Sequence, residues 1–343
     1  MKNTVTLKDV AKLAGVSTAA VSKALRGEKD IGPETRAKIE KIADSLGYCP
    51  NNLAIYLRTG SIKAIGVLMP DNFNHYNALV LQGVEEKAKE YGYNVIIGNT
   101  SCDHEIEKDL LKSFISMKVS GILTIPSWLD NYKNIPVPLV FMSRFPYMEP
   151  YASKMHAILR TSDVQYIVND DFAGEYIATE HLLRRGFEHP YLIIGSTDPD
   201  SAEGVMNLTR KDGYKKALSD FGVPFSEDHV LEGIRSAHES YSAVTDLIKN
   251  STGRIGLCMN MDHLALAAIS AAHDCGAKIP EQVALVGYDD IESAKYMTPA
   301  LTTIRQSKYA IGSQAAMQVI SARDGAAPWH KVVKPSLVIR QTT

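Results

Sequence analysis

Short apolar runs alternate with amphipathic helical stretches from residue 62 onward, and this alternation constrains the fold more than any other feature of the chain. Strands are expected at residues 64–69, 94–98, 121–125, 139–142, 166–168, 191–195, 255–259 and 283–287. Helices are expected at residues 78–91, 105–117, 172–185, 210–221, 240–249, 262–275 and 309–322. Strands separated by helices favour βαβ units, so this region is predicted to be α/β, with doubly wound parallel sheets in two subdomains. Ligands of such sheets bind beyond the carboxyl ends of the strands.

The size and composition of the chain are those of a soluble protein with more than one domain. Its 343 residues exceed what one ordinary core organises, and hydrophobic residues (45%) and charged residues (22%) occur in usual proportions. No apolar run reaches the roughly 18 residues of a membrane span, and the N-terminus does not resemble a signal peptide. A cytoplasmic location without membrane contact is therefore expected.

The chain shows no motif for catalysis, a cofactor or a metal. There is no Gly-x-Gly-x-x-Gly after the first strand, no phosphate-binding loop and no nucleophile elbow around Ser196. The cysteines, Cys49, Cys102, Cys258 and Cys275, lack metal-ligand spacing. We therefore predict a protein that is not an enzyme and holds neither cofactor nor metal.

The first sixty residues are basic, whereas the rest of the chain is acidic. They contain ten Lys or Arg and six Asp or Glu, a net charge of +4, which leaves −6 for the remainder because the whole chain carries −2. A basic segment on an acidic body suits a module that approaches phosphate groups. A solvated helical face would explain this charge equally well.

Three short helices can be read in this basic segment. The first follows a capping box at Thr6 and ends at Gly15; the second begins after Ser17 and runs from Thr18 to Leu25. Pro33 opens the third. Two short helices joined by a tight turn and backed by a third form a helix-turn-helix, although a small helical domain with a polar surface fits the same pattern. On the second helix Val21 and Leu25 are predicted to be buried. The outward face carries Thr18, Ala19, Ser22 and Lys23, which suit base edges and phosphate.

The run from Thr6 to Ser17 resembles the opening of the lactose/galactose repressor family of bacterial regulators. Val21 to Leu25 and the sequence Leu46-Gly47-Tyr48 continue the resemblance. It implies a DNA-binding head at residues 1–48 and a hinge at 49–60 that orders on DNA. The implied DNA contacts are Thr6, Leu7, Ser17, Thr18, Ala19, Ser22 and Lys23 in the head, and Asn51, Ala54 and Leu57 in the hinge.

Within the hinge, Leu57 matches the leucine that this family inserts into the minor groove, although it could instead contact its own body. Ala20 and Lys23 depart from the usual residues, which puts the operator sequence in doubt but not DNA binding.

The resemblance also implies that residues 61–343 form a two-lobed body like a periplasmic sugar-binding protein, which binds an effector and dimerises. Lobe one is expected at about 62–165 and 305–326, and lobe two at about 166–300 and 330–343. The segment 145–165 is longer than the usual connection, and the sequence gives no physical account of it. A homodimer on a near-palindromic operator follows from the family pattern.

Polar residues that follow strand ends mark a candidate effector site. They are Tyr76, Arg144, Arg210, Asp289 and Gln306. A carboxylate and a guanidinium that face one cavity can bind paired hydroxyls, and Arg210 and Asp289 match effector-binding positions of the family. A plain ion pair without a ligand is the alternative for these two residues.

Two further positions of this site depart from the family. Met261 replaces an amide that commonly contacts a sugar, and Arg235 replaces an aromatic residue, which favours an anionic ligand such as a sugar phosphate. The leading hypothesis is a repressor controlled by a sugar or sugar derivative between the lobes. A ligand-independent or protein-responsive regulator with a vestigial cleft is the alternative.

Overall fold

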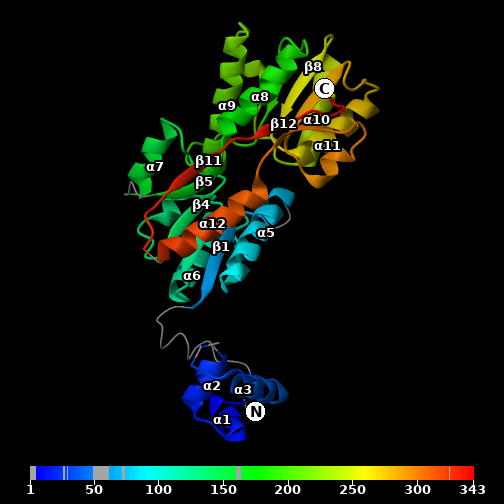
Figure 1. Ribbon diagram of the computed structural model, residues 1–343. Helices are drawn as coiled ribbons and strands as arrows, with labels where there is room; N and C mark the ends of the chain where they lie inside the picture. Colours follow the sequence, from blue (N-terminus) through cyan, green and yellow to red (C-terminus); the bar gives the residue numbers. More distant parts are fainter. Residues whose placement is uncertain are drawn as a thin grey trace. The chain divides into compact units, whose positions relative to one another are not determined.

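The computed structural model describes residues 5–25, 28, 30–48, 62–71, 74–159, 164–323 and 325–343. Its contacts divide the chain into two compact units, Met1–Ile62 and Lys63–Thr343 (Figure 1). The described part of the first unit contains helices and no strand, and the second unit contains two sheets with helices on their faces. This confirms the predicted fold class. Among the described residues, no helix is long and apolar enough to cross a membrane.

The head contains α1 (Leu7–Ala14), α2 (Thr18–Leu25) and α3 (Pro33–Ser45). The Asp9 carboxylate accepts the Thr6 backbone N–H at 2.8 Å and so caps α1, and Gly15 ends that helix with a left-handed φ of 72°. The three helices share one small core. Val21 is fully buried as predicted, but Leu25 is only half-buried, and Ala24 takes the second buried place on α2.

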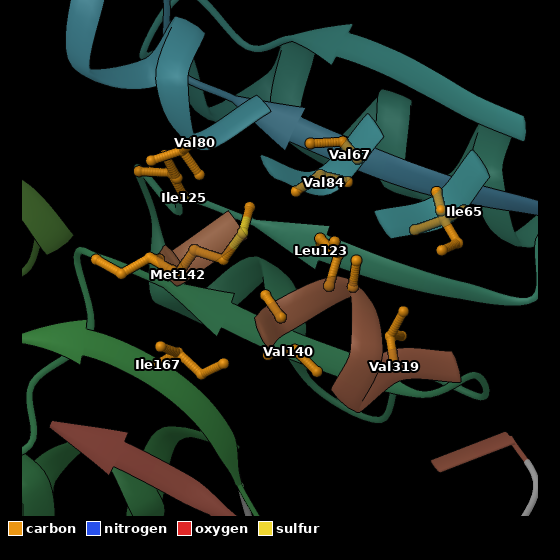
Figure 2. Packing of buried hydrophobic residues seen from close by; sticks show 14 of the residues in the cluster. Ile65, Val67, Val80, Val84, Leu123, Ile125, Val140, Met142, Ile167 and Val319 are labelled. Atoms are coloured by element: carbon orange, nitrogen blue, oxygen red, sulfur yellow. The ribbon is translucent and has the colours of Figure 1, made fainter. Parts of the chain in front are cut away.

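The first sheet of the body is parallel, in the order β11-β5-β4-β3-β1-β2. Its strands are β1 (Ala64–Met69), β2 (Asn94–Asn99), β3 (Gly121–Thr124), β4 (Leu139–Met142), β5 (Gln165–Asn169) and β11 (His330–Val333). The helices of this lobe are α5 (His75–Glu90), α6 (His104–Ser116), α7 (Tyr151–Leu159) and α12 (Lys308–Arg323). Figure 2 shows apolar side chains of β1, β3, β4 and β5 meeting those of α5 and α12.

Two glycines allow α5 and α12 to cross closely. A methyl group at Gly312 would overlap the backbone carbonyl of Val80, and one at Gly83 would overlap that of Tyr309. Each helix therefore presents a glycine to the other, which brings both against the same face of the first sheet.

The second sheet has the order β12-β10-β9-β8-β6-β7 and is parallel except for its edge strand β12. Its strands are β6 (Tyr191–Ile193), β7 (Val230–Leu231), β8 (Ile255–Met259), β9 (Val283–Asp289), β10 (Thr302–Arg305) and β12 (Ser336–Val338). One face packs against α8 (Asp171–Arg184) and α9 (Ala202–Asp220). The other face packs against α10 (Ala237–Asn250) and α11 (Asp262–Asp274).

The chain passes between the lobes after β5, after β10 and after β11, and this corrects the predicted lobe boundaries. The strand expected at 166–168 belongs to lobe one, because β5 pairs with β4 in the first sheet. Residues 330–333 also belong to lobe one, since β11 pairs with β5. Lobe two therefore begins near residue 170 and its final segment begins near 336. The sequence of an apolar run does not indicate which sheet the strand joins, because the strands that pair with it can lie far away in the chain.

The long segment 145–165 contains a helix that the sequence analysis did not anticipate. Helix α7 buries Met155 and Leu159 against lobe one, where it lies next to the short 3-10 helix η1 (Leu129–Tyr132). The ammonium of Lys154, on the exposed side of α7, lies 2.8 Å from the carboxylate of Asp200 in lobe two. The segment therefore contributes a contact between the lobes.

Candidate functional site

Helix α2 presents the face that the sequence predicts to read DNA. Thr18 and Ala19 are exposed, and Ser22 and Lys23 are partly exposed. Ser17 caps the helix, since its hydroxyl accepts the Ala20 N–H at 3.1 Å. This cap fixes the start of α2, where the small side chains of Thr18 and Ala19 are exposed.

Other predicted DNA contacts have structural roles within the head. The Thr6 hydroxyl donates to the Asp9 carboxylate at 2.7 Å, and Leu7 packs partly into the core. Lys23 forms an ion pair with Asp30. Because an ammonium has three donors, Lys23 can meet a phosphate or a base either while it keeps Asp30 or after it exchanges that carboxylate. The hinge residues Asn51, Ala54 and Leu57 lie outside the described residues, so their roles stay predictions.

In the body, a small chamber of about 40 Å³ lies between the lobes. It collects almost all of the predicted effector residues, namely Tyr76, Arg144, Arg210, Met261, Asp289 and Gln306. Residues that the sequence analysis did not single out complete it: Asn74, Asn77, Ile125, Ser143, Asn169, Asp171 and Met206. We call this cavity the inner chamber. Arg235 does not line it.

The wall from lobe two is built around a buried cation. Arg210 is only 4% exposed and donates to the Asp171 carboxylate at 2.8 and 2.9 Å. Its Nη1 also donates to the backbone and side-chain oxygens of Asn260 at 2.9 and 2.7 Å, and the guanidinium lies 3.6 Å from the centre of the Tyr288 ring. Burial opposes the charge of Arg210, but the Asp171 carboxylate raises its pKa, so it stays protonated. The cation is therefore held in one orientation before any ligand arrives.

Asp289 lies beside this cation at the end of β9. Its backbone has a φ of 114°, a region that side chains other than glycine rarely adopt. The carboxylate accepts the Gln306 amide at 2.6 Å, and the Lys308 ammonium donates to the Asp289 backbone carbonyl. Burial raises the pKa of Asp289 to about 6, although Arg210 and Lys308 oppose the rise. At neutral pH the group is therefore an ionised acceptor aimed into the chamber.

The wall from lobe one is neutral apart from Arg144. Asn169 donates to the Tyr76 hydroxyl at 2.8 Å, and that hydroxyl lies 2.6 Å from the Ser143 hydroxyl. The opposite end of the amide, Asn169 Oδ1, is buried without a hydrogen-bond partner among the described residues, and so is Arg144 Nη1. Lobe one therefore has one buried acceptor and one buried donor whose hydrogen bonds are not made within the described residues.

A second cavity of about 590 Å³ adjoins the inner chamber, and we call it the outer chamber. Its lining shares Asn74, Asn77, Arg144 and Met261 with the inner chamber. Arg235 faces this outer chamber, where its Nε lies 3.7 Å from the Glu203 carboxylate. The positive charge that Arg235 adds is thus balanced by the carboxylate of Glu203.

A helix-turn-helix head joined to a two-lobed body with a polar interlobe cavity is the combination expected of a DNA-binding regulator with a ligand-binding domain. The comparisons with known proteins identify the family. Residues 6–51 match the model for bacterial regulatory proteins of the lacI family, and residues 179–343 match the periplasmic binding protein-like domain. An HTH-type transcriptional repressor PurR of Aliivibrio fischeri is 32% identical over 319 residues, covering 90% of this chain and 89% of the relative.

This chain belongs to the lacI family, which confirms the predicted resemblance. It is a DNA-binding transcriptional repressor with a ligand-binding domain, and its relatives are repressors, not enzymes. Two solved structures share the fold. The Lac repressor dimer bound to operator and the anti-inducer ONPF has a TM-score of 0.81 at 23% identity and covers 98% of each chain. The transcriptional regulator CelR-cellobiose complex has a TM-score of 0.69 at 23% identity, covering 99% of this chain and 100% of that chain.

Proposed function

We propose that this repressor binds a near-palindromic operator as a homodimer, and that a sugar or sugar derivative in the inner chamber sets its operator affinity. One observation carries the effector assignment. Asn169 and Arg144, each with a buried polar atom that has no partner among the described residues, line the same chamber as the preoriented Arg210 and Asp289. Such a set of donors and acceptors around a cavity is a ligand site that the protein leaves incomplete.

The charges of the inner chamber favour a neutral, hydroxylated ligand. Two cations, Arg144 and Arg210, face two carboxylates, Asp171 and Asp289, so the formal charges cancel. A hydroxyl group both donates and accepts, so neighbouring hydroxyls can satisfy the Asn169 oxygen, the Arg144 nitrogen and the Asp289 carboxylate together.

The small volume of the inner chamber links binding to lobe geometry. Ligand pockets usually measure about 300–1,000 Å³, whereas the inner chamber measures about 40 Å³. A sugar ring therefore fits only in a different arrangement of the lobes, and the ligand selects that arrangement. We propose that this selection is passed to the hinge at residues 49–60, where Asn51, Ala54 and Leu57 meet the minor groove in the operator-bound state.

The head supplies the sequence reading in this proposal. Thr18, Ala19 and Ser22 approach base edges in the major groove, and Lys23 leaves Asp30 for a guanine or a phosphate. One head offers only a small interface, so two heads related by twofold symmetry are needed for specific binding. The Lac repressor, which shares this fold, was solved as a dimer on its operator.

A binding experiment tests the effector and the operator together. An operator is selected from random duplex DNA with the full-length protein, and its affinity is measured by fluorescence anisotropy. The measurement is repeated with neutral sugars, sugar phosphates and nucleosides, and calorimetry records direct binding of each. We expect at least one neutral sugar or glycoside to bind and to change operator affinity.

The control for this experiment is the exposed variant Asp109→Asn on α6, which should respond to the effector as wild type does, whereas Asp289→Asn should respond weakly. Binding by nucleosides alone would replace the sugar assignment. An operator affinity that no compound changes would favour a regulator that responds to a protein or to no ligand.

A further inference from the structure

Trp128 occupies a position in the cleft that neither the sequence analysis nor the proposed function uses. It lies between β3 and η1 at the edge of lobe one, and its half-buried side chain lines the outer chamber. Its backbone pairs with Ser201 of lobe two in an isolated antiparallel bridge. The indole is therefore located where the two lobes meet, at the mouth of the effector cleft.

A buried carboxylate holds this tryptophan in place. Glu107 is fully buried on α6 and accepts the backbone N–H groups of Ser127 at 2.9 Å and Trp128 at 3.1 Å. The Asn131 amide donates to the same carboxylate at 3.3 Å. Burial raises the pKa of Glu107, while these hydrogen bonds lower it. A buried carboxylate is costly unless its partners are fixed, so the turn that carries Trp128 is rigid.

The ring itself is also fixed. The indole Nε1 donates to the Cys102 carbonyl at 3.2 Å, and the His104 ring packs edge-on with its centre 5.6 Å from that of Trp128. The one polar atom of the side chain is thus satisfied by the protein. What remains toward the outer chamber is an apolar aromatic surface in a fixed orientation, which suits stacking against a flat or chair-shaped apolar face.

The charges around this aromatic surface favour hydroxyl groups over anions. The outer chamber is lined by three carboxylates, Asp71, Asp198 and Glu203, and by two guanidinium groups, Arg144 and Arg235. His263 adds no charge at neutral pH, because burial lowers its pKa. The resulting net charge of about −1 disfavours a phosphate, whereas carboxylates accept hydroxyl protons well.

We infer that Trp128 forms an outer subsite that stacks against the second ring of a two-ring glycoside, so that the effector is a disaccharide or related glycoside and not a free monosaccharide. This rests on the proposed function, in which the lobes rearrange so that the inner chamber admits the first ring. The two chambers share four lining residues, so one ligand can pass from one to the other. The carboxylates of Asp71 and Asp198 would accept hydrogen bonds from hydroxyl groups of the second ring, while the apolar face of that ring covers the indole.

The two tryptophans of the chain make the subsite directly observable. In the Trp329→Phe variant, Trp128 is the only tryptophan, and excitation at the red edge of the absorption band selects its emission over that of the tyrosines. Glucose and galactose are titrated beside cellobiose, maltose and lactose, with glucose 6-phosphate as the anionic probe. We expect at least one disaccharide to bind more tightly than its component monosaccharides and to change the Trp128 emission.

Substitutions then separate stacking from folding. Trp128→Ala should weaken disaccharide binding by about tenfold and monosaccharide binding by less than about twofold, because only the second ring loses its surface. Trp128→Phe keeps an aromatic face and should retain most of the affinity, which makes the result independent of any unfolding in the alanine variant. Trp329→Ala is the matched control and should bind as wild type does.

The outcomes distinguish this inference from the function on which it rests. A monosaccharide that binds as tightly as any disaccharide, with no effect of Trp128→Ala, would remove the outer subsite and leave the sugar-responsive repressor intact. Binding of glucose 6-phosphate alone would overturn the charge argument and the subsite with it. If no sugar binds at all, both the sugar effector and the subsite are wrong.

Discussion

The two walls of the inner chamber differ in how much of their hydrogen bonding is already complete. On lobe two, Arg210 has partners for its charge and for most of its donors, and Asp289 is held by Gln306. On lobe one, Asn169 and Arg144 each keep a buried polar atom without a partner among the described residues. Lobe two is therefore preorganised, whereas we propose that the effector completes the hydrogen bonding of lobe one. We therefore expect substitutions on the two walls to differ in the size of their effects on stability and on effector affinity.

The largest effect is expected for Arg210→Ala. The substitution leaves the Asp171 carboxylate buried without its cation, which typically costs about 3–5 kcal/mol of unfolding free energy. We also expect effector binding to be lost. Denaturant unfolding of the body measures the stability change, and Arg184→Ala, which removes an exposed arginine on α8, is the matched control. A loss below about 1 kcal/mol would mean that lobe two is not preorganised by this ion pair.

Asp289→Asn should act mainly on ligand binding. The amide keeps the size of the carboxylate but accepts fewer hydrogen bonds and removes a charge from the chamber. We expect effector affinity to fall by about 1–3 kcal/mol, or roughly five- to hundredfold. Calorimetry measures the loss. An unchanged affinity would show that the effector contacts lobe two somewhere other than Asp289.

The same carboxylate predicts a pH dependence of binding. Because the pKa of Asp289 is raised to about 6, the group is ionised at neutral pH and becomes protonated as the pH falls below this value. A protonated Asp289 loses its charge and an acceptor, so effector affinity should decrease on acidification, by up to about tenfold per pH unit. The Asp289→Asn variant should show a flatter profile. Equal pH profiles for the two proteins would assign the dependence to another group.

The smallest effect is expected for Tyr76→Phe on lobe one. It removes the hydroxyl that accepts from Asn169 and contacts Ser143, a neutral network worth about 1 kcal/mol of stability. Effector affinity should fall less than in Asp289→Asn. Tyr309→Phe, which removes an exposed hydroxyl bonded to Glu86, is the matched control. A loss of unfolding free energy as large as that of Arg210→Ala would show that the two walls do not differ in preorganisation.

Residues that follow strands could be predicted for the inner chamber, but their mutual partners could not. Tyr76, Asp289 and Gln306 were found because parallel strands deliver their ends to one edge. The same rule would have found Asn169 and Asp171 had the strand before them been assigned to lobe one. Asn260, a partner of Arg210, lies fifty residues from it, and no local pattern connects the two.

The remaining differences have similar physical causes. Strands β7, β10, β11 and β12 have only two to four residues, too few for a periodic signal, and they exist because longer neighbours pair with them. Arg235 was placed in the effector site by its family position, but it faces the outer chamber. The sequence did not indicate a binding role for Trp128, because an aromatic residue that follows a strand usually belongs to the hydrophobic core.

The passage of the chain from lobe to lobe has a consequence for biosynthesis. Lobe one begins first at the ribosome but stays incomplete until almost the whole chain has been made, because α12 and β11 come from residues 308–333. Until α12 arrives, the apolar face that Val319 and its neighbours cover has no second helix on it. Lobe two at the same stage lacks its edge strand β12 and the C-terminal residues that follow it, but both of its sheet faces already have their helices. Nascent lobe one is therefore the part of this body that most needs protection from aggregation.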